Sequence, residues 1–248
     1  SQSISSTTGS LSVALNAGGS VTMESVINTN GGTLTIVAGG AVTQGAGSVL
    51  TIGDTTSVTT GNAAITLEGA GTNNFVGAVT LTNTGAFDVS VSSNTALTLG
   101  AVSAGRNFSA TTASSINVTN TINTLAEANG GTVTLNGGTG LTIGALGDIT
   151  SDGAVNLTSA AGISTAGDVT TTNDVVNYNS ATTLTDNVLV NTGAGIGDIN
   201  FASTLDGAHT LGLTAGTGSI TFTGAVGDTI TLASLTVVSA GDISIGNA

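Results

Sequence analysis

The stretch at residues 147–173, GDITSDGAVNLTSAAGISTAGDVTTTN, contains Gly-Asp twice, at positions 147–148 and 167–168, each time followed by a β-branched residue and Thr. Between the two copies, Val155, Asn156 and Leu157 alternate apolar and polar side chains, the period-two pattern of a β-strand with one buried face. The Gly, Asp and Ser residues around them accept the turn conformations that end a strand. The stretch therefore predicts short strands separated by corners, with Gly-Asp at the corners.

The same apolar-polar-apolar triplet recurs along the whole chain. Successive triplets commonly follow one another as closely as those that begin at Val133 and Leu141, and Gly, Asn, Asp or Ser separate them. Two or three strands with their corners then complete one turn in roughly 20–25 residues, a period typical of solenoid repeats. The triplets occupy residues 11–13, 34–36, 65–67, 79–81, 89–91, 97–99, 116–118, 133–135, 141–143, 155–157, 211–213, 220–222, 230–232 and 243–245.

Strands this short favour a parallel β-solenoid over a β-sandwich, whose strands run to about five or six residues. We expect an all-β, single-stranded parallel β-helix of roughly 10–12 coils, with residues 1–248 forming one continuous segment. Aromatic residues make up only 2% of the chain, so Val, Ile, Leu and Ala must fill the interior. The five Phe residues, at 75, 87, 108, 201 and 222, are expected to help fill it. Many Asn side chains should stack in register from coil to coil.

Composition limits the partners of the chain. The formal charge is −13, with 14 acidic residues and Arg106 as the single Lys or Arg. Nucleic acid requires clustered basic residues, so we expect no nucleic-acid partner. The chain has no Cys, so disulfides are not expected. It has no run of 18 apolar residues either, so membrane insertion is not expected. Neither end of the sequence shows the charges or Pro that block an open β-edge, so we expect continuation into further coils or self-association.

The composition and motif pattern of the chain resemble those of a known family of bacterial proteins. GAVTLTNTGAFDVSVSSNTALTLGAVSAG (77–105) and FASTLDGAHTLGLTAGTGSITFTGAVGDTITLASLTVVSAGDISIG (201–246) are similar in composition and phrasing to the repeats of filamentous-haemagglutinin-type exoproteins and related giant bacterial surface proteins. The resemblance implies a right-handed parallel β-helix, export across a Gram-negative outer membrane, and service as an adhesin shaft or filament. It carries over no binding residue for a glycan or host receptor.

Asp148, Asp152 and Asp168 are the candidate metal ligands of the chain. Asp148 and Asp152 have an Asp-x-x-x-Asp spacing that could share a calcium ion at one corner. The tandem Gly-Gly-x-Gly-x-Asp repeat of calcium-binding β-helices is absent. The alternative is that each Asp accepts a backbone N–H within or beside its turn. Calcium therefore stays a hypothesis, and no other cofactor is indicated.

No constellation of residues predicts catalysis. His209 is the single His in a chain without Cys, which cannot build the usual zinc site. His209 lies shortly after Asp206 in the sequence, a coincidence too weak to indicate a nucleophile triad. Arg106 is expected to pair with a nearby Asp or carbonyl. We therefore expect no enzyme and no catalytic residue.

The expected function is structural: a shaft, filament or sheath segment of an extracellular or cell-surface β-solenoid protein. The alternative is a carbohydrate-binding or polysaccharide-cleaving β-helix module that uses Asp and Asn in a groove. Ice binding is a minor alternative, because Thr-x-Thr occurs at residues 33–35, 80–82, 132–134 and 221–223. The irregular separations of these motifs, however, predict no continuous Thr face.

Overall fold

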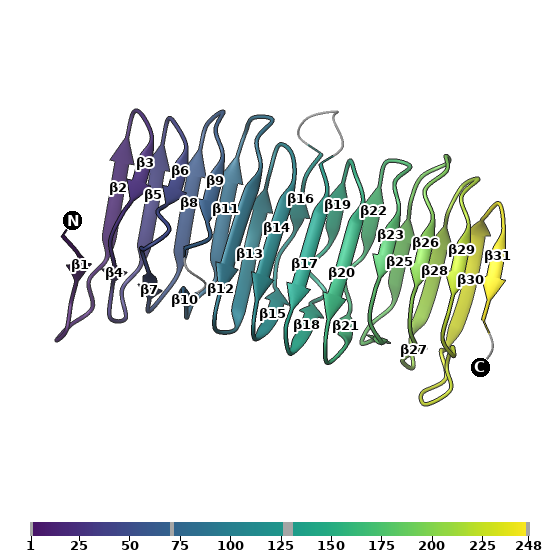
Figure 1. Cartoon of the computed structure of the whole chain (residues 1–248). Helices are drawn as coiled ribbons and strands as arrows, with labels where there is room; N and C mark the ends of the chain where they lie inside the picture. The colour runs from purple at the N-terminus through teal and green to yellow at the C-terminus, as the bar shows by residue number, and fades with distance from the viewer. Residues whose placement is uncertain (1, 70–71, 126–130, 247–248) are drawn as a thin grey trace.

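The chain folds into a parallel β-solenoid in a computed structural model that describes residues 2–69, 72–125 and 131–246 (Figure 1). Within those residues the regular elements are all strands, and every strand pair is parallel. The chain advances from one end of the rod to the other, so that each coil lies against the coil before it and the coil after it. The expected fold class is confirmed.

The strands form three sheets. The eleven-stranded sheet contains, in spatial order, β3 (Val21–Met23), β6 (Val42–Gln44), β9 (Ile65–Leu67), β12 (Val89–Ser93), β14 (Phe108–Thr112), β17 (Val133–Gly137), β20 (Val155–Ser159), β23 (Val176–Tyr178), β26 (Ile199–Phe201), β29 (Ile220–Phe222) and β31 (Ile243–Ile245). It has one strand in each coil, so the rod has eleven coils. That number agrees with the sequence-based expectation.

The sixteen-stranded sheet divides at its longest strand, β13. One end of β13 pairs with β15, and the other end pairs with β16. The strands of this sheet are β2 (Val13–Ala17), β5 (Leu34–Ala38), β8 (Thr56–Thr60), β11 (Val79–Asn83), β13 (Leu97–Ser103), β15 (Ser115–Val118), β16 (Ile122–Asn123), β18 (Gly140–Ile143), β19 (Ile149–Ser151), β21 (Ile163–Thr165), β22 (Val169–Thr171), β24 (Thr182–Leu184), β25 (Val188–Asn191), β27 (Leu205–Asp206), β28 (Thr210–Thr214) and β30 (Ser234–Ser239). A four-stranded sheet near the N-terminus contains β1 (Ile4–Ser5), β4 (Ile27–Asn28), β7 (Leu50–Ile52) and β10 (Asn74–Phe75).

Corners, rather than strands, absorb the differences in coil length. Ser90 pairs with Ser109, and Ser109 pairs in turn with Thr134, so the second of these coils is longer in sequence than the first. Strand register is nevertheless kept, because a slip of one residue would turn every inward side chain outward. The coils therefore differ in the number of residues they contain but keep the same strand register.

The core is a narrow aliphatic column. Inward positions of adjacent strands coincide, as in the pairs Val133 with Val155 and Leu135 with Leu157, and all four side chains are completely buried. Burial of stacked aliphatic side chains, each worth about 1.5–3 kcal/mol, stabilises the rod along its whole length. Aromatic rings are confined to a few coils.

Three expectations about strands and core residues are wrong. The triplet at 11–13 lies mostly before its strand, since β2 begins only at Val13. Phe87 is 42% exposed, because it lies in the corner before β12 rather than on a strand. The triplet at 230–232 forms no strand but belongs to the connection between β29 and β30, where the backbone N–H groups of Thr229 and Ile230 donate to Asp206 Oδ1, both at 3.0 Å. The other four Phe side chains are buried as expected.

Among the described residues no helix has the length and apolarity needed to span a bilayer.

Candidate functional site

The aspartates of the Gly-Asp corners connect consecutive coils. The backbone N–H of Asp168 donates to Asp148 Oδ1 at 2.9 Å, and the backbone N–H of Leu189 donates to Asp168 Oδ1 at 2.8 Å. Each carboxylate thus accepts from a backbone group about one coil later in the sequence. A charge-assisted hydrogen bond of this kind holds the corners in register.

Asp152 lies away from Asp148, at the opposite end of the short strand β19. An extended chain between the two positions separates their Cα atoms by ~13 Å, too far for both carboxylates to bind one cation. Asp152 Oδ1 instead accepts from the Thr172 hydroxyl at 2.5 Å. The pKa of the Asp174 carboxyl is raised by partial burial and, secondarily, by the negative charge of Asp152. The three candidate calcium ligands therefore do not converge.

No group of three or more His, Asp or Glu side chains in the described ranges is arranged to hold a metal ion. Arg106 pairs with Asp88 at 3.5 Å, and both side chains are about half exposed. Asn107 Nδ2 also donates to Asp88, at 3.0 Å. Asp206 Oδ1 accepts the backbone N–H groups of Thr229 and Ile230 in the connection before β30. Within the described residues, no hydrogen bond joins the His209 ring to a hydroxyl or a carboxylate.

The outward side of the eleven-stranded sheet carries one continuous row of small polar side chains, which we call the polar row. Each strand contributes one residue, and each residue is in register with its neighbours in the adjacent coils. The polar row consists of Thr22, Thr43, Thr66, Ser90, Ser109, Thr134, Asn156, Asn177, Asn200, Thr221 and Ser244. None of these side chains is buried, and none is ionisable.

A second row follows the sixteen-stranded sheet and has a single apolar member, Val37. It consists of Asn16, Val37, Thr59, Thr82, Ser103, Asn123, Thr150, Thr170, Asn191, Thr214 and Ser239. The sequence does contain a signal for such rows, since the middle residue of nearly every triplet is Ser, Thr or Asn. The rows do not follow from the sequence alone, because the separations between their members vary from coil to coil.

Part of the polar row is an asparagine ladder. Asn177 Nδ2 donates to Asn156 Oδ1 at 2.9 Å, and Asn200 Nδ2 donates to Asn177 Oδ1 at 3.0 Å. The expected stacking of Asn side chains in register is confirmed here. The ladder satisfies amide groups along the rod axis and leaves their outer edges open to solvent.

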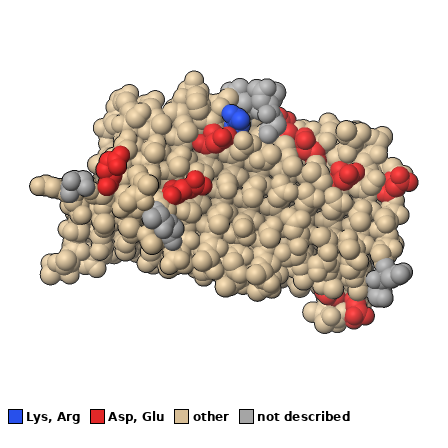
Figure 2. Space-filling model, viewed as in Figure 1, with Lys and Arg blue, Asp and Glu red and all other residues tan. Residues whose placement is uncertain are grey.

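Much of the face that Figure 2 shows is uncharged. Its acidic side chains lie mainly along the upper edge and near the ends of the rod, with one further group on the face toward the N-terminal end. A polar hollow of about 310 Å³ lies over β18, β21 and β24, and its lining residues include Thr142, Ser164 and Thr183. No residue that lines this hollow is ionisable, so it holds no acid or base for glycoside chemistry.

Comparison with known proteins gives one match. A family model described as "Repeats of unknown function (DUF5649)" matches residues 11–82, from just before β2 into β11. No curated protein matches the chain, and no solved structure matches it. The matched family is one of repeats, in agreement with the repeating coils of the fold.

Proposed function

We propose that this chain is a structural segment of an extracellular or cell-surface bacterial β-solenoid protein, where it serves as a shaft, filament or sheath. The observation that carries the proposal is the unbroken parallel register of eleven strands from β3 to β31 over one apolar core. Such a rod has backbone hydrogen bonds along its whole length, and it resists bending because each coil is bonded to both neighbours. Its mechanism is mechanical, and the proposal includes no catalysis and no cofactor.

Surface chemistry supports the same role. A single Arg and a formal charge of −13 suit a soluble exterior that avoids nucleic acid and anionic membranes. The resemblance to exported haemagglutinin-type repeats supports an extracellular or cell-surface location and an adhesin-related parent. Any glycan or host receptor would then bind to a part of the assembly other than the solenoid interior.

Electron microscopy of the purified chain combined with limited proteolysis tests the proposal. We expect straight rods of uniform width whose coils resist protease, since short corners offer few cleavable loops. A glycan array and a polysaccharide depolymerisation assay form the second arm. Measurable turnover that is abolished by substitution of one Asp would contradict the structural role.

The polar row favours a second candidate function, ice binding. Its hydroxyl and amide groups repeat with the ~4.8 Å spacing of parallel strands on a rigid surface. The irregular motif separations that argued against such a surface are compensated by corner length, as the register shows. Inhibition of ice recrystallisation by the chain should be lost in Thr134→Lys and kept in Ala145→Lys, a change at an exposed corner. Equal activity of the two variants, or none in the unmodified chain, excludes this function.

A further inference from the structure

The outward side of the eleven-stranded sheet is broad in the middle of the rod. There β12, β14, β17 and β20 have five residues each, so each strand presents two outward side chains. The additional side chains form a second row beside the polar row, in register from coil to coil, and we call this pair of rows the double row. It consists of Ser90 and Ser92, Ser109 and Thr111, Thr134 and Asn136, and Asn156 and Thr158.

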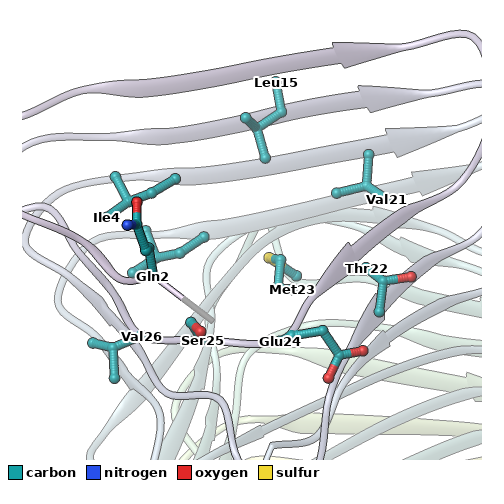
Figure 3. A pocket seen from close by; sticks show the side chains of 10 residues that line it. Gln2, Ile4, Leu15, Val21, Thr22, Met23, Glu24, Ser25 and Val26 are labelled. Atoms are coloured by element: carbon teal, nitrogen blue, oxygen red, sulfur yellow. The ribbon is translucent and has the colours of Figure 1, made fainter.

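Alternation along each strand turns the double row outward. Figure 3 shows this alternation at β3, beside an apolar hollow of about 260 Å³. Val21 and Met23 lie on the same side of the strand as Leu15, and Thr22, a member of the polar row, lies on the other side. The double row therefore lies on the outer surface, away from the aliphatic core.

The sheet that carries the double row is regular and uncharged. Among the described residues, each of its strand pairs keeps one register. The sixteen-stranded sheet instead has bulges between β11 and β13 and between β28 and β30. The strands of the eleven-stranded sheet contain no Asp, Glu, His or Arg, although the formal charge of the chain is −13. Another uncharged surface can therefore approach this sheet closely.

The side chains of the double row can both donate and accept hydrogen bonds. Within the described residues, the hydroxyl groups of Ser90, Ser109 and Thr134 have no hydrogen-bond partner. Hydroxyl and amide groups each combine a donor with an acceptor, so a copy of the same surface can satisfy them. Identical sheets with small, uncharged side chains interdigitate in this way in steric zippers. The chemistry of the double row thus fits a second copy of itself.

The two edges of this sheet differ in charge. We call the corners that precede its strands the leading edge and the corners that follow its strands the trailing edge. The described part of the trailing edge carries Glu24 and Glu68. The described part of the leading edge carries Arg106, the single blue side chain in Figure 2, and five aspartates. These aspartates are Asp88, Asp152, Asp174, Asp198 and Asp242.

We infer that two copies of this chain pair face to face through the double row, with both rods pointing in the same direction. The inference rests on the proposed structural role, because it names a second copy as the partner of the shaft. A two-fold axis parallel to the rods places each coil opposite the same coil of the second copy. It also places each leading edge opposite a trailing edge. Rods that pointed in opposite directions would bring two leading edges together, and repulsion between their aspartates disfavours that arrangement.

The area of the sheet limits the strength of the pairing. Strands of three to five residues, spaced ~4.8 Å apart, give the eleven-stranded sheet an outward area of roughly 500–800 Å². A standard protein interface buries about 800 Å² on each partner. We therefore expect reversible pairing that depends on concentration. Added salt should strengthen it, because salt screens the repulsion between two chains of formal charge −13.

Sedimentation velocity of residues 1–248 across a concentration series tests the pairing. The unmodified chain should form dimers whose fraction increases with concentration and with salt. Thr134→Asp brings two carboxylates together in the interface and should weaken dimerisation at least ~10-fold. Thr59→Asp is the matched control, because Thr59 is also a partly buried, outward threonine but lies on the sixteen-stranded sheet. It should dimerise like the unmodified chain, and equal effects of the two variants would overturn the proposed interface.

The absence of Cys from the chain allows the direction of the rods to be tested by cross-linking. Ser90→Cys and Asn156→Cys each supply a single thiol, and three coils separate the two positions. If the rods point in the same direction, each variant should cross-link to itself through a short bis-maleimide, since facing sheets lie ~10 Å apart. If the rods point in opposite directions, at most one of the two positions can face itself. Self-cross-linking of one variant alone, or of neither, would overturn the parallel arrangement.

The same samples distinguish the pairing from the proposed functions. Straight, protease-resistant rods that remain monomeric at every concentration would overturn the pairing and leave the structural role standing. Compact or unfolded particles would overturn the structural role itself. Inhibition of ice recrystallisation by a chain that remains monomeric would assign the double row to ice instead.

Circular dichroism of Thr134→Asp must retain the β-signal. Should Thr134→Asp not fold, Ser109→Asp, one coil earlier in the polar row, replaces it. Dimerisation of a folded Ser109→Asp variant as strong as that of the unmodified chain would overturn the pairing in the same way.

Discussion

The rings of Tyr178 and Phe201 are stacked in consecutive coils, with centroids 4.7 Å apart and planes 10° apart. Phe222 continues the stack at 5.4 Å from Phe201. The Tyr178 hydroxyl is buried, and no donor or acceptor in the described residues bonds to it. Tyr178→Phe keeps the stack and removes a buried polar group without a partner, so the free energy of unfolding should rise by about 1–2 kcal/mol. Denaturant titration of the two chains measures the difference, and a loss of stability would show that the hydroxyl has a partner.

Tyr178 also makes the fold sensitive to alkali. Burial, and secondarily the negative charge of Asp168, raise the pKa of the Tyr178 hydroxyl above its ordinary value of 10.0. Above that pH the unfolded chain loses the proton and the folded chain keeps it, so stability falls as pH rises. The fall should reach up to ~1.4 kcal/mol per pH unit. Unfolding curves measured from about pH 9 to about pH 11, a range centred on the ordinary pKa of tyrosine, should show this slope in the unmodified chain. Tyr178→Phe should lack it.

Substitutions of Asp168 distinguish a carboxylate that accepts a backbone N–H from one that binds calcium. Asp168→Ala removes the acceptor for the Leu189 N–H and should lower the free energy of unfolding by about 1–2 kcal/mol. Asp168→Asn keeps an acceptor oxygen and should cost less than half as much. A chelator should leave the melting temperature of the unmodified chain unchanged. Equal losses in the Asn and Ala variants, together with a chelator effect, would instead indicate bound calcium.

Gly105 marks a place where consecutive coils approach closely. A Cβ atom at this position would overlap the carbonyl oxygen of Gly85 in the preceding coil. Gly105→Ala should therefore force the coils apart and lower the free energy of unfolding by about 1–3 kcal/mol. Gly61 is the matched control, because a Cβ there meets no atom within 4 Å. Gly61→Ala should change stability by no more than ~0.5 kcal/mol in thermal or denaturant unfolding.

The sequence predicts this fold well because its strongest signal is local. Alternation within triplets such as 133–135 and 155–157 determines which side chains face inward, and the structure buries those side chains. The short triplets also predict stacked coils, because a β-sandwich is built from longer strands of about five or six residues. Phe87 was misplaced because apolar character alone does not distinguish a corner from a strand. The triplet at 230–232 was misplaced because a longer corner held by Asp206 replaces a strand there.

The candidate site was less predictable, because its features depend on separations that vary from coil to coil. Thr134 and Thr221 belong to one row although they lie several coils apart along the rod. Only the strand register shows that they align. Asp148 and Asp152 are close in sequence but lie at the two ends of β19, since an extended strand moves its ends apart. Sequence proximity therefore suggested a shared ion that the fold separates.

The hydrogen bonds of the asparagine ladder should stabilise the fold beyond what polar side chains on the surface contribute. Asn177 donates to Asn156 and accepts from Asn200, so one side chain connects three coils. Asn177→Ala breaks both hydrogen bonds and should lower the free energy of unfolding by about 1–2 kcal/mol. Asn136→Ala is the control: Asn136 faces outward on the same sheet, is exposed, and its side chain has no hydrogen bond within the described residues. That variant should lose no more than ~0.5 kcal/mol. If chemical denaturation gives equal losses for the two variants, the ladder contributes only surface polarity, and the register is held by backbone hydrogen bonds and the aliphatic core alone.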